Sequence, residues 1–447
     1  MKHFFCLTIA LTLTIQAFFA QSKEERPNVI LIYSGDQGYM DLGAYGAKDL
    51  HTPNLDLLAK RGTRFTQAYA AAPVCSPSRA ALLTGNYPQR AGQVGNAPMQ
   101  HGAQGGMATQ QYTMAELFRD GGYKTAHIGK WHLGYTDDKM PNGQGFDYSF
   151  GFMGRVIDNY SHYWSNNHDL WENGTEIYRN GEYFPDLMVE HSAKFLDQVP
   201  GQPFFMYWAI NIPHYPYQGE PKWIEHYKDL PFPRNKYAAF ISSMDEKIGD
   251  LVQLLEDRGL MENTIIVFQS DHGFSRENVA SGGGGSAGIY RGSKFSLLEG
   301  GVRVPAFISW EGHIPDNAVE SALVTNIDWF PTLAELCGLS MTGKPIDGNS
   351  MVPLLQGSSK KGTHKTFVWQ SLGTRERPQW AVRDDNWKLL HYPYEVGEGE
   401  LDPDGFFLVD LEKDPSETTN LAGEHPRILK RLHKKYLDWK AYVGEQQ

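Results

Sequence analysis

The chain has 447 residues, of which 41% are hydrophobic and 21% are charged, an ordinary composition for a globular protein. This length is sufficient for one large domain and a small one. The formal net charge of −11 argues against nucleic acid as a partner, because the chain has no excess of basic residues. An anionic substrate would therefore have to be attracted by a local group of cations.

Residues 1–20 are predicted to be a secretory signal peptide. Lys2 and His3 precede an apolar stretch, and cleavage is expected after Ala20. The stretch is shorter than most membrane spans, and no other long apolar run follows it. We therefore expect an exported protein, periplasmic or secreted, without a membrane span.

The cysteines give no disulfide framework. Cys6 lies inside the predicted signal peptide, which leaves Cys75 and Cys337. A disulfide between these two is formally possible. However, Cys337 belongs to an amphipathic run that ends at Gly338, a pattern that favours a small core residue near a helix end.

The middle of the chain alternates short apolar runs with amphipathic helices. Helices are expected from Pro53 onward, around 114–118 and over 237–258, and in the last of these apolar residues form one stripe. This alternation predicts an α/β fold with a large, mostly parallel sheet and helices on both faces. The expected buried strands are 28–33, 124–128, 204–210, 264–269 and 304–310.

The pattern changes after about residue 345. Short strands separated by turns are expected at 380–383, 387–391 and 406–409, and a final helix follows them. We therefore predict three parts. They are the signal peptide 1–20, a large α/β domain over 21–345, and a small C-terminal α+β subdomain over 346–447 with an antiparallel sheet and one helix.

The most informative segment is residues 75–85, Cys-Ser-Pro-Ser-Arg-Ala-Ala-Leu-Leu-Thr-Gly. Pro77 suits the first turn of a helix, which Gly85 would end. Cys75 would then lie just ahead of a helix N-terminus, where free N–H groups and the positive end of the dipole attract anions. Arg79 lies one turn into this helix. The whole run resembles the signature of the type I sulfatases.

This resemblance implies a nucleophile, a modification and a partner. In that family a maturation enzyme oxidises the cysteine to formylglycine (3-oxoalanine), whose hydrated aldehyde attacks the sulfur of a sulfate ester. The resemblance therefore implies that Cys75 is converted in this way by a formylglycine-generating maturation enzyme and that Arg79 steadies the modified residue. It also implies an alkaline phosphatase-like fold for the large domain.

Acidic side chains follow two of the predicted strands. Asp36 follows the first strand, and Asp271 and His272 follow the fourth. Ligands of open α/β sheets bind outside the carboxyl ends of the strands, so these side chains should converge with Cys75. Oxygen ligands suit Ca²⁺ or Mg²⁺. We expect a divalent metal, with Ca²⁺ favoured, bound by Asp36, Cys75, Asp271 and His272.

The sequence departs from the family pattern at this metal site. Gly35 stands where the family usually has the first of two consecutive aspartates. Gln37 could take its place in an Asp36–Gln37 pair, as in some relatives that hydrolyse phosphonates. His272, where many relatives have asparagine, could coordinate the metal or only form a hydrogen bond. Imidazole slightly favours a borderline metal over Ca²⁺.

Four further side chains receive roles from the resemblance. Lys130 and His132 lie in a Gly-Lys-Trp-His segment after the second strand, and their spacing would put both on one face of an extended segment. Lys130 and Lys294 would hold sulfate oxygens. His132 would act as the base that helps the sulfated intermediate to collapse. His214 would protonate the leaving oxygen, which suits a pKa near neutrality.

The predicted function is therefore an exported, formylglycine-dependent sulfatase whose substrate is a sulfated carbohydrate. Residues 158–164 and Trp171 fall in the variable, substrate-facing stretch, where the aromatic rings could stack on sugars or belong to the core. Two alternatives are open. A phosphonate or phosphate ester hydrolase of the same superfamily is favoured by His272. A non-catalytic carbohydrate-binding relative is suggested by the loss of a carboxylate at Gly35.

Overall fold

The computed structural model describes residues 26–341, 343, 345–374 and 376–444. The predicted signal peptide, with Cys6, lies outside the described residues. Within the described part of the chain, no helix combines the length and the apolar character needed to cross a membrane.

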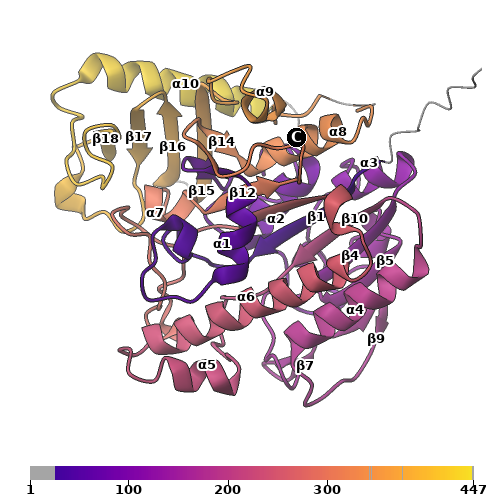
Figure 1. Ribbon diagram of the computed structural model, residues 1–447. Coiled ribbons are helices and arrows are strands. Elements are labelled where there is room, and N and C mark those ends of the chain that lie inside the picture. The colour runs from indigo at the N-terminus through magenta and orange to yellow at the C-terminus, as the bar shows by residue number, and fades with distance from the viewer. Residues whose placement is uncertain (1–25, 342, 344, 375, 445–447) are drawn as a thin grey trace, which may run out of the picture.

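A ten-stranded sheet forms the centre of the molecule (Figure 1). Its middle is a group of five parallel strands in the spatial order β11–β1–β10–β4–β5. Strands β12, β2 and β13 extend one edge, and β8 and β9 extend the other. The bounds are Asn28–Ser34 (β1), Gly62–Phe65 (β2), Lys124–Lys130 (β4), Tyr148–Phe152 (β5), Trp171–Glu172 (β8), Thr175–Glu176 (β9), Phe204–Ala209 (β10), Thr264–Ser270 (β11), Ala306–Ser309 (β12) and Ala318–Glu320 (β13).

All five predicted strands are present, but the last one, β12, is antiparallel to its neighbours β11 and β2. The reason lies in the segment 271–305 between β11 and β12. It contains no helix long enough to lead the chain back along the sheet, only the short helices η4 (Asn278–Ala280) and α7 (Glu299–Val302). The chain therefore re-enters the sheet from the edge at which β11 ended.

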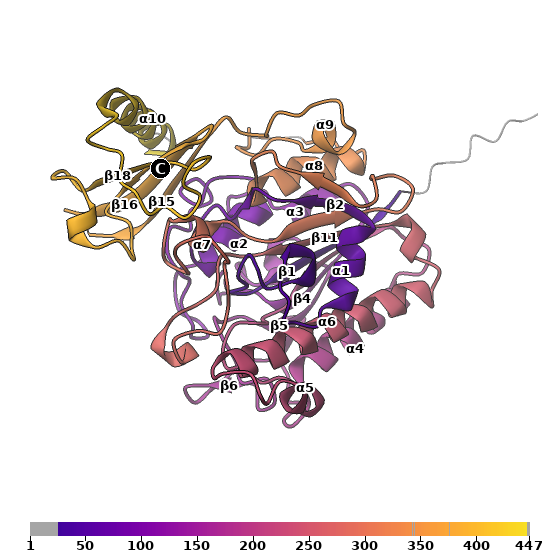
Figure 2. The ribbon, with the colours of Figure 1, turned by 60° about the vertical axis from the view of Figure 1, so that its left-hand side comes forward.

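Helices cover both faces of the sheet (Figure 2). Helices α2, α3, α8 and α9 pack on one face, and α1, α4 and α6 pack on the other. In β1, Leu31 and Tyr33 join the first core and Ile30 and Ile32 join the second, which explains why the strand has no polar residue between Val29 and Ile32. The helices span Pro53–Lys60 (α1), Cys75–Thr84 (α2), Met114–Asp120 (α3), Phe184–Gln198 (α4), Pro221–His226 (α5), Arg234–Glu256 (α6), Trp329–Leu336 (α8) and Val352–Leu355 (α9).

A four-stranded antiparallel sheet, β15–β16–β17–β18, and a long helix form the C-terminal part, which lies beside the large sheet (Figures 1 and 2). The three predicted strands correspond to β16, β17 and β18, whereas β15 was not predicted. In β15, consecutive residues Phe367, Val368 and Trp369 are all buried, so the strand lacks the alternation typical of a half-exposed strand. The bounds are Thr366–Gly373 (β15), Pro378–Asp384 (β16), Trp387–His391 (β17), Phe406–Asp410 (β18) and Pro426–Gly444 (α10).

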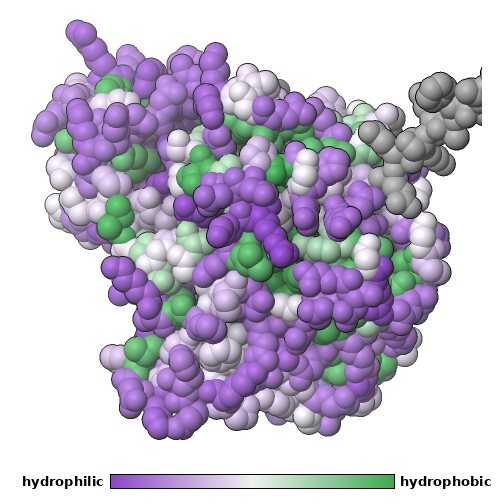
Figure 3. All heavy atoms as spheres, viewed as in Figure 1, coloured by the Kyte–Doolittle hydropathy of each residue, from purple (hydrophilic) through white to green (hydrophobic). Residues whose placement is uncertain are grey.

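The small sheet and the large domain share a hydrophobic core. Tyr69 and Leu298 of the large domain belong to the same buried cluster as Trp369 and Leu389 of the small sheet. The face of the molecule seen in Figure 3 is mostly hydrophilic, with small hydrophobic patches scattered over it. The proposed division of the chain near residue 345 stays a prediction.

Candidate active site

The carboxyl ends of the parallel strands bring the predicted site residues together. Asp36 lies two residues beyond β1, Asp271 directly follows β11, and Lys130 is the last residue of β4. Cys75 is the first residue of α2, and all four side chains are buried. The sequence placed Cys75 just ahead of this helix, so its position differs from the prediction by less than a turn.

Four side chains form a compact group that could hold a metal ion. One ligand atom from each of Asp36, Cys75, Asp271 and His272 lies within 4.8 Å of the others. The Nε2 atom of His272 is 3.2 Å from the Cys75 Sγ atom and 3.3 Å from Asp36 Oδ1. Its Nδ1 atom lies 2.9 Å from the Gly273 carbonyl oxygen, and this contact orients Nε2 toward the group. Two carboxylates and an imidazole fit a divalent cation.

The structure explains how the chain accommodates the missing carboxylate at position 35. A Cβ atom on Gly35 would lie 3.1 Å from the carbonyl oxygen of Asn211 and 3.6 Å from the Cβ atom of His214. The turn that carries His214 therefore occupies the space next to Gly35. Gln37 does not compensate, because its amide accepts a hydrogen bond from Ser34 (2.8 Å) and donates one to the Asp41 carbonyl (3.0 Å).

Cys75 lies in a strongly positive environment. Lys130 Nζ is 3.5 Å from the Cys75 Sγ atom. Burial raises the pKa of the thiol, but the ammonium groups of Lys130 and Lys294 outweigh burial and lower the pKa of Cys75 to about 5. Arg79 does not bind the sulfur. Its guanidinium donates to Asp271 Oδ2 (2.8 Å) and so ties α2 to the metal-ligand group.

Lys294 and His214 close the other side of the site. Lys294 Nζ donates to Asp36 Oδ2 at 2.8 Å, pairs with Glu277 at 3.1 Å, and lies 3.5 Å from His214 Nε2. The His214 Nδ1 atom is 2.8 Å from the carbonyl oxygen of Tyr215. Burial lowers the pKa of His214, and Lys130 and Lys294 lower it further, so the resting imidazole is neutral. Its Nδ1–H then donates to Tyr215, and the Nε2 lone pair faces Lys294.

His132 reaches the site by a route that differs from the prediction. Strand β4 ends at Lys130, and His132 has a φ of 57°, so the two residues do not share an extended segment. Its carbonyl accepts a hydrogen bond from Ser76 Oγ at 2.6 Å, beside Cys75. Both ring nitrogens of His132 are buried without a hydrogen-bond partner among the described residues. Unpaired buried polar atoms are costly, and a bound ligand, ion or water would satisfy these two nitrogens.

Two groups at this site were not found from the sequence. Glu277, the second partner of Lys294, lies in a loop without a recognisable motif. Arg155 follows β5 and acts electrostatically on His132 and His214. Neither position carried a local signal, because both reach the site through long-range folding.

The aromatic residues of the variable stretch divide between core and site. Trp171 is buried, and its indole donates to Asp169 at 2.8 Å, so it belongs to the core. Trp164 is half-buried, and its ring centroid lies 6.1 Å from that of Tyr215, next to His214. Trp164, beside His214, and the exposed Tyr163 therefore remain available for a sugar ring.

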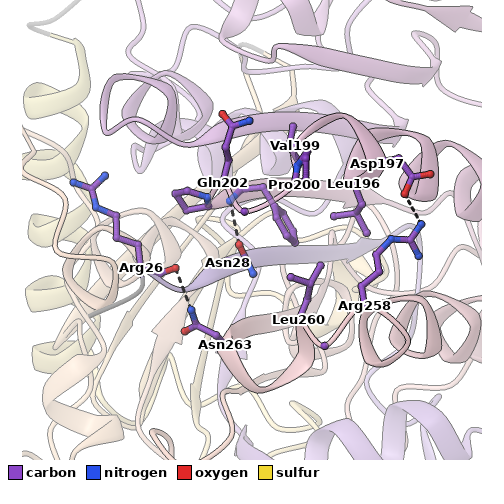
Figure 4. Close-up of a pocket in the computed structure, with 14 residues that line it drawn as sticks. Arg26, Asn28, Leu196, Asp197, Val199, Pro200, Gln202, Arg258, Leu260 and Asn263 are labelled. Atoms are coloured by element: carbon purple, nitrogen blue, oxygen red, sulfur yellow. Dashed lines mark hydrogen bonds and ion pairs between the residues drawn. The ribbon is translucent and has the colours of Figure 1, made fainter. Parts of the chain in front are cut away.

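A pocket of about 460 Å³ lies at the opposite edge of the sheet, near the start of β1 and β10 (Figure 4). Several of its polar side chains are engaged by neighbouring groups. Arg258 binds Asp197 at 2.7 Å, and Asn263 donates to the Arg26 carbonyl. The chemically reactive groups described above all lie at the carboxyl edge of the strands, away from this pocket.

Comparison with known proteins gives consistent matches. The sulfatase family model matches residues 27–339, and a model described as N-sulphoglucosamine sulphohydrolase, C-terminal, matches residues 288–441. Arylsulfatase A of Homo sapiens is 32% identical over 451 residues, which cover 91% of this chain and 86% of the relative. N-acetylgalactosamine-6-sulfatase of Homo sapiens is 33% identical over 390 residues, which cover 78% and 73%. A crystal structure of Ps i-CgsB in complex with k-i-k-neocarrahexaose has a TM-score of 0.85 at 31% identity and covers 94% of each chain.

Proposed function

The chain belongs to the sulfatase family, whose members hydrolyse sulfate esters, and on this premise we propose how its site works and on which substrate. We propose that Cys75 is converted to formylglycine and that the enzyme removes sulfate from a sulfated carbohydrate. One observation carries the proposal. The Cys75 Sγ atom is buried 3.2 Å from His272 and 3.5 Å from Lys130, inside the group of possible metal ligands.

The side chains around Cys75 suit the binding of a sulfuryl group. Lys130 at the end of β4 and Lys294 in the loop before α7 are buried ammonium groups that both act on Cys75. Preorganised cations in a water-poor site stabilise the negative charge that develops on the transferring group. Asp36, Asp271 and His272 would hold a divalent cation, which would neutralise and orient the sulfate when bound. We propose Ca²⁺, because carboxylate oxygens form the larger part of the donor set.

His214 and His132 suit the two proton transfers of the reaction, one to the leaving oxygen and one from the modified residue when the sulfate departs. The hydrated aldehyde of that modified residue supplies the nucleophile. His214, held by Tyr215, would protonate the leaving oxygen, since the negative charge of a bound sulfate raises the pKa of a neighbouring imidazole. His132 has both ring nitrogens free among the described residues and would accept the proton when the sulfate departs.

The proposed substrate class and location rest on two supports. Ps i-CgsB, which is 31% identical to this chain, was solved with k-i-k-neocarrahexaose. The signal peptide predicted at 1–20 would direct the protein out of the cytoplasm. Sulfated polysaccharides would be available to it there, outside the cytoplasm. The proposed partners are the sulfated carbohydrate and a formylglycine-generating maturation enzyme.

The test is a side-by-side assay of sulfate, phosphate and phosphonate esters of one aryl alcohol. Protein co-expressed with a maturation enzyme should hydrolyse the sulfate ester fastest, and Cys75→Ala should abolish this activity. Faster hydrolysis of the phosphonate would favour the alternative hydrolase. An Asp36–Gln37 metal-binding pair does not support this alternative, because the Gln37 amide is held by Ser34 and the Asp41 carbonyl.

A further inference from the structure

We infer that Arg155 and the hydroxyl group of Tyr215 form a binding site for a second anionic group of the substrate, next to the sulfate that is hydrolysed. The chemistry recognised is an oxyanion, either a second sulfate or a carboxylate on the same or the adjoining sugar. This inference rests on the proposed function and extends it from the reaction to the choice of substrate.

Arg155 is placed between the two site histidines by contacts on both sides. His132 donates its backbone N–H to the Met153 carbonyl at 3.1 Å, two residues before Arg155. On the other side, Val156 packs in a small buried cluster with Tyr215, the residue that follows His214. The segment carrying Arg155 therefore runs from one histidine to the other.

The base of this segment is rigid. The buried carboxylate of Asp169 accepts hydrogen bonds from the backbone N–H groups of Met153 (3.0 Å) and Gly154 (2.8 Å). It also accepts one from the Trp171 indole at 2.8 Å. A Cβ atom on Gly154 would lie 2.8 Å from Asp169 Oδ2, so any other residue here would displace this carboxylate. A fixed backbone lowers the entropic cost of using Arg155 to bind a ligand.

The polar atoms of this site lack partners. The Arg155 guanidinium makes no hydrogen bond or ion pair with any residue that the structure describes, although its Nε atom is buried. The hydroxyl oxygen of Tyr215 is likewise buried and unpaired within the described chain, in a residue that is 2% exposed. Buried donors without acceptors are unfavourable. A guanidinium offers several donors in one plane, which match the oxygens of a sulfate or carboxylate.

The electric field of Arg155 reaches the reacting groups. Burial is the largest cause of the lowered pKa of His132 and of His214, and the Arg155 guanidinium adds to the lowering of both. It also helps to lower the pKa of Glu277, the partner of Lys294. Because Val156 contacts Tyr215 and Met153 binds His132, an anion bound to Arg155 would lie close to the hydrolysed sulfate. Trp164, beside the Tyr215 ring, would line the space between them.

The experiment compares Arg155→Ala with the unmodified enzyme on four substrates. They are 4-nitrophenyl sulfate, a monosulfated hexopyranoside, the same hexopyranoside with a second sulfate, and the monosulfated sugar linked to a uronate. We expect Arg155→Ala to raise KM for a doubly anionic substrate by about 10- to 100-fold, as for a lost charged hydrogen bond. The losses of kcat/KM for 4-nitrophenyl sulfate and for the monosulfated sugar should be equal to each other and much smaller, because these substrates lose only the effect of the Arg155 charge on His132 and His214. The substrate that shows the loss identifies sulfate or carboxylate as the second group.

Controls separate this role from a structural one. Arg119→Ala removes a half-exposed arginine of α3 and should change none of the four reactions. Tyr215→Phe should raise KM only for the doubly anionic substrate, and by a smaller factor than Arg155→Ala does. If Arg155→Ala unfolds, Arg155→Gln gives the same comparison. Equal losses on all four substrates, or no loss on either doubly anionic sugar, would overturn the inference.

A binding measurement distinguishes failure of this inference from failure of the proposed function. The Cys75→Ser variant, with and without Arg155→Ala, is titrated calorimetrically with the disulfated sugar and with the uronate-linked sugar. A weaker Kd in the double variant supports the anion site even if no sulfate ester is hydrolysed. If the unmodified enzyme hydrolyses the sulfate ester but Cys75→Ser binds both sugars equally well with and without Arg155→Ala, the anion site is overturned and the proposed function stands.

Discussion

Replacement of His214 by asparagine should slow the enzyme by an amount that depends on the leaving group. The imidazole Nε2 lies 3.5 Å from Lys294 Nζ and 3.8 Å from Asp36 Oδ2, inside the site. Asparagine can still donate to the Tyr215 carbonyl, which now accepts from Nδ1 at 2.8 Å, but it cannot donate a proton to an alkoxide. General acid catalysis typically contributes about 10²–10⁴-fold, which corresponds to about 3–5 kcal/mol of transition-state stabilisation.

A sugar alkoxide is a poor leaving group and needs this proton, whereas 4-nitrophenolate is stable without it. We therefore expect His214→Asn to lower kcat for a sugar sulfate by about 10²–10⁴-fold and kcat for 4-nitrophenyl sulfate by about tenfold or less. The exposed His226 of α5 gives a matched control, and His226→Asn should leave both rates unchanged. An equal loss on the two substrates would refute the role of His214 as the general acid.

Four further results are expected. Lys388→Met should lower the free energy of unfolding, measured in urea, by about 3–5 kcal/mol. The buried side chains of Glu299 and Glu417, each 2.9 Å from Lys388 Nζ, would lose the cation that they share. A loss below about 1 kcal/mol would contradict this. Burial raises the pKa of Glu417 from 4.5 to about 7. The stability contributed by Glu417 is then complete below pH 4.5 and is lost as the pH rises through about 7. The free energy of unfolding should therefore fall between pH 4.5 and 7, and it should fall less in Glu417→Gln protein. Gly35→Asp should not increase metal affinity in calorimetry, because its Cβ atom would lie 3.1 Å from the Asn211 carbonyl oxygen. Tighter metal binding would show that the turn containing Asn211 can move to accept the new side chain. Removal of the metal by a chelator should lower both activity and Tm, and elemental analysis of the untreated protein should find about one divalent ion per chain.

Much of the fold could be predicted because its signals are local. In β1 every residue is buried, and the residues from Val29 to Ile32 are all apolar, as expected for a strand covered on both faces. Gly85 ends α2 with a φ of 65°, as the Gly-terminated pattern indicated. The convergence of Asp36 and Asp271 followed from strand ends alone, since parallel strands end at one edge of the sheet.

Other features depend on contacts between distant segments and left no local signal. The direction of β12 is set by the path of 271–305, and the φ of 57° at His132 follows no periodic pattern. The side chain of Gln37 is captured by Ser34 and the Asp41 carbonyl, which composition alone cannot show. Arg155 belongs to no motif in the sequence, and only the fold brings it near two site histidines.

The most direct test of the account is peptide mass spectrometry of the Cys75 peptide from protein co-expressed with a formylglycine-generating enzyme. The account predicts a loss of about 18 Da, from thiol to aldehyde, in the peptide that contains Cys75. The loss should be absent in Cys75→Ser protein. A Cys75 that stays a thiol under conditions that convert a control sulfatase would contradict the proposed mechanism and favour a non-catalytic, carbohydrate-binding role.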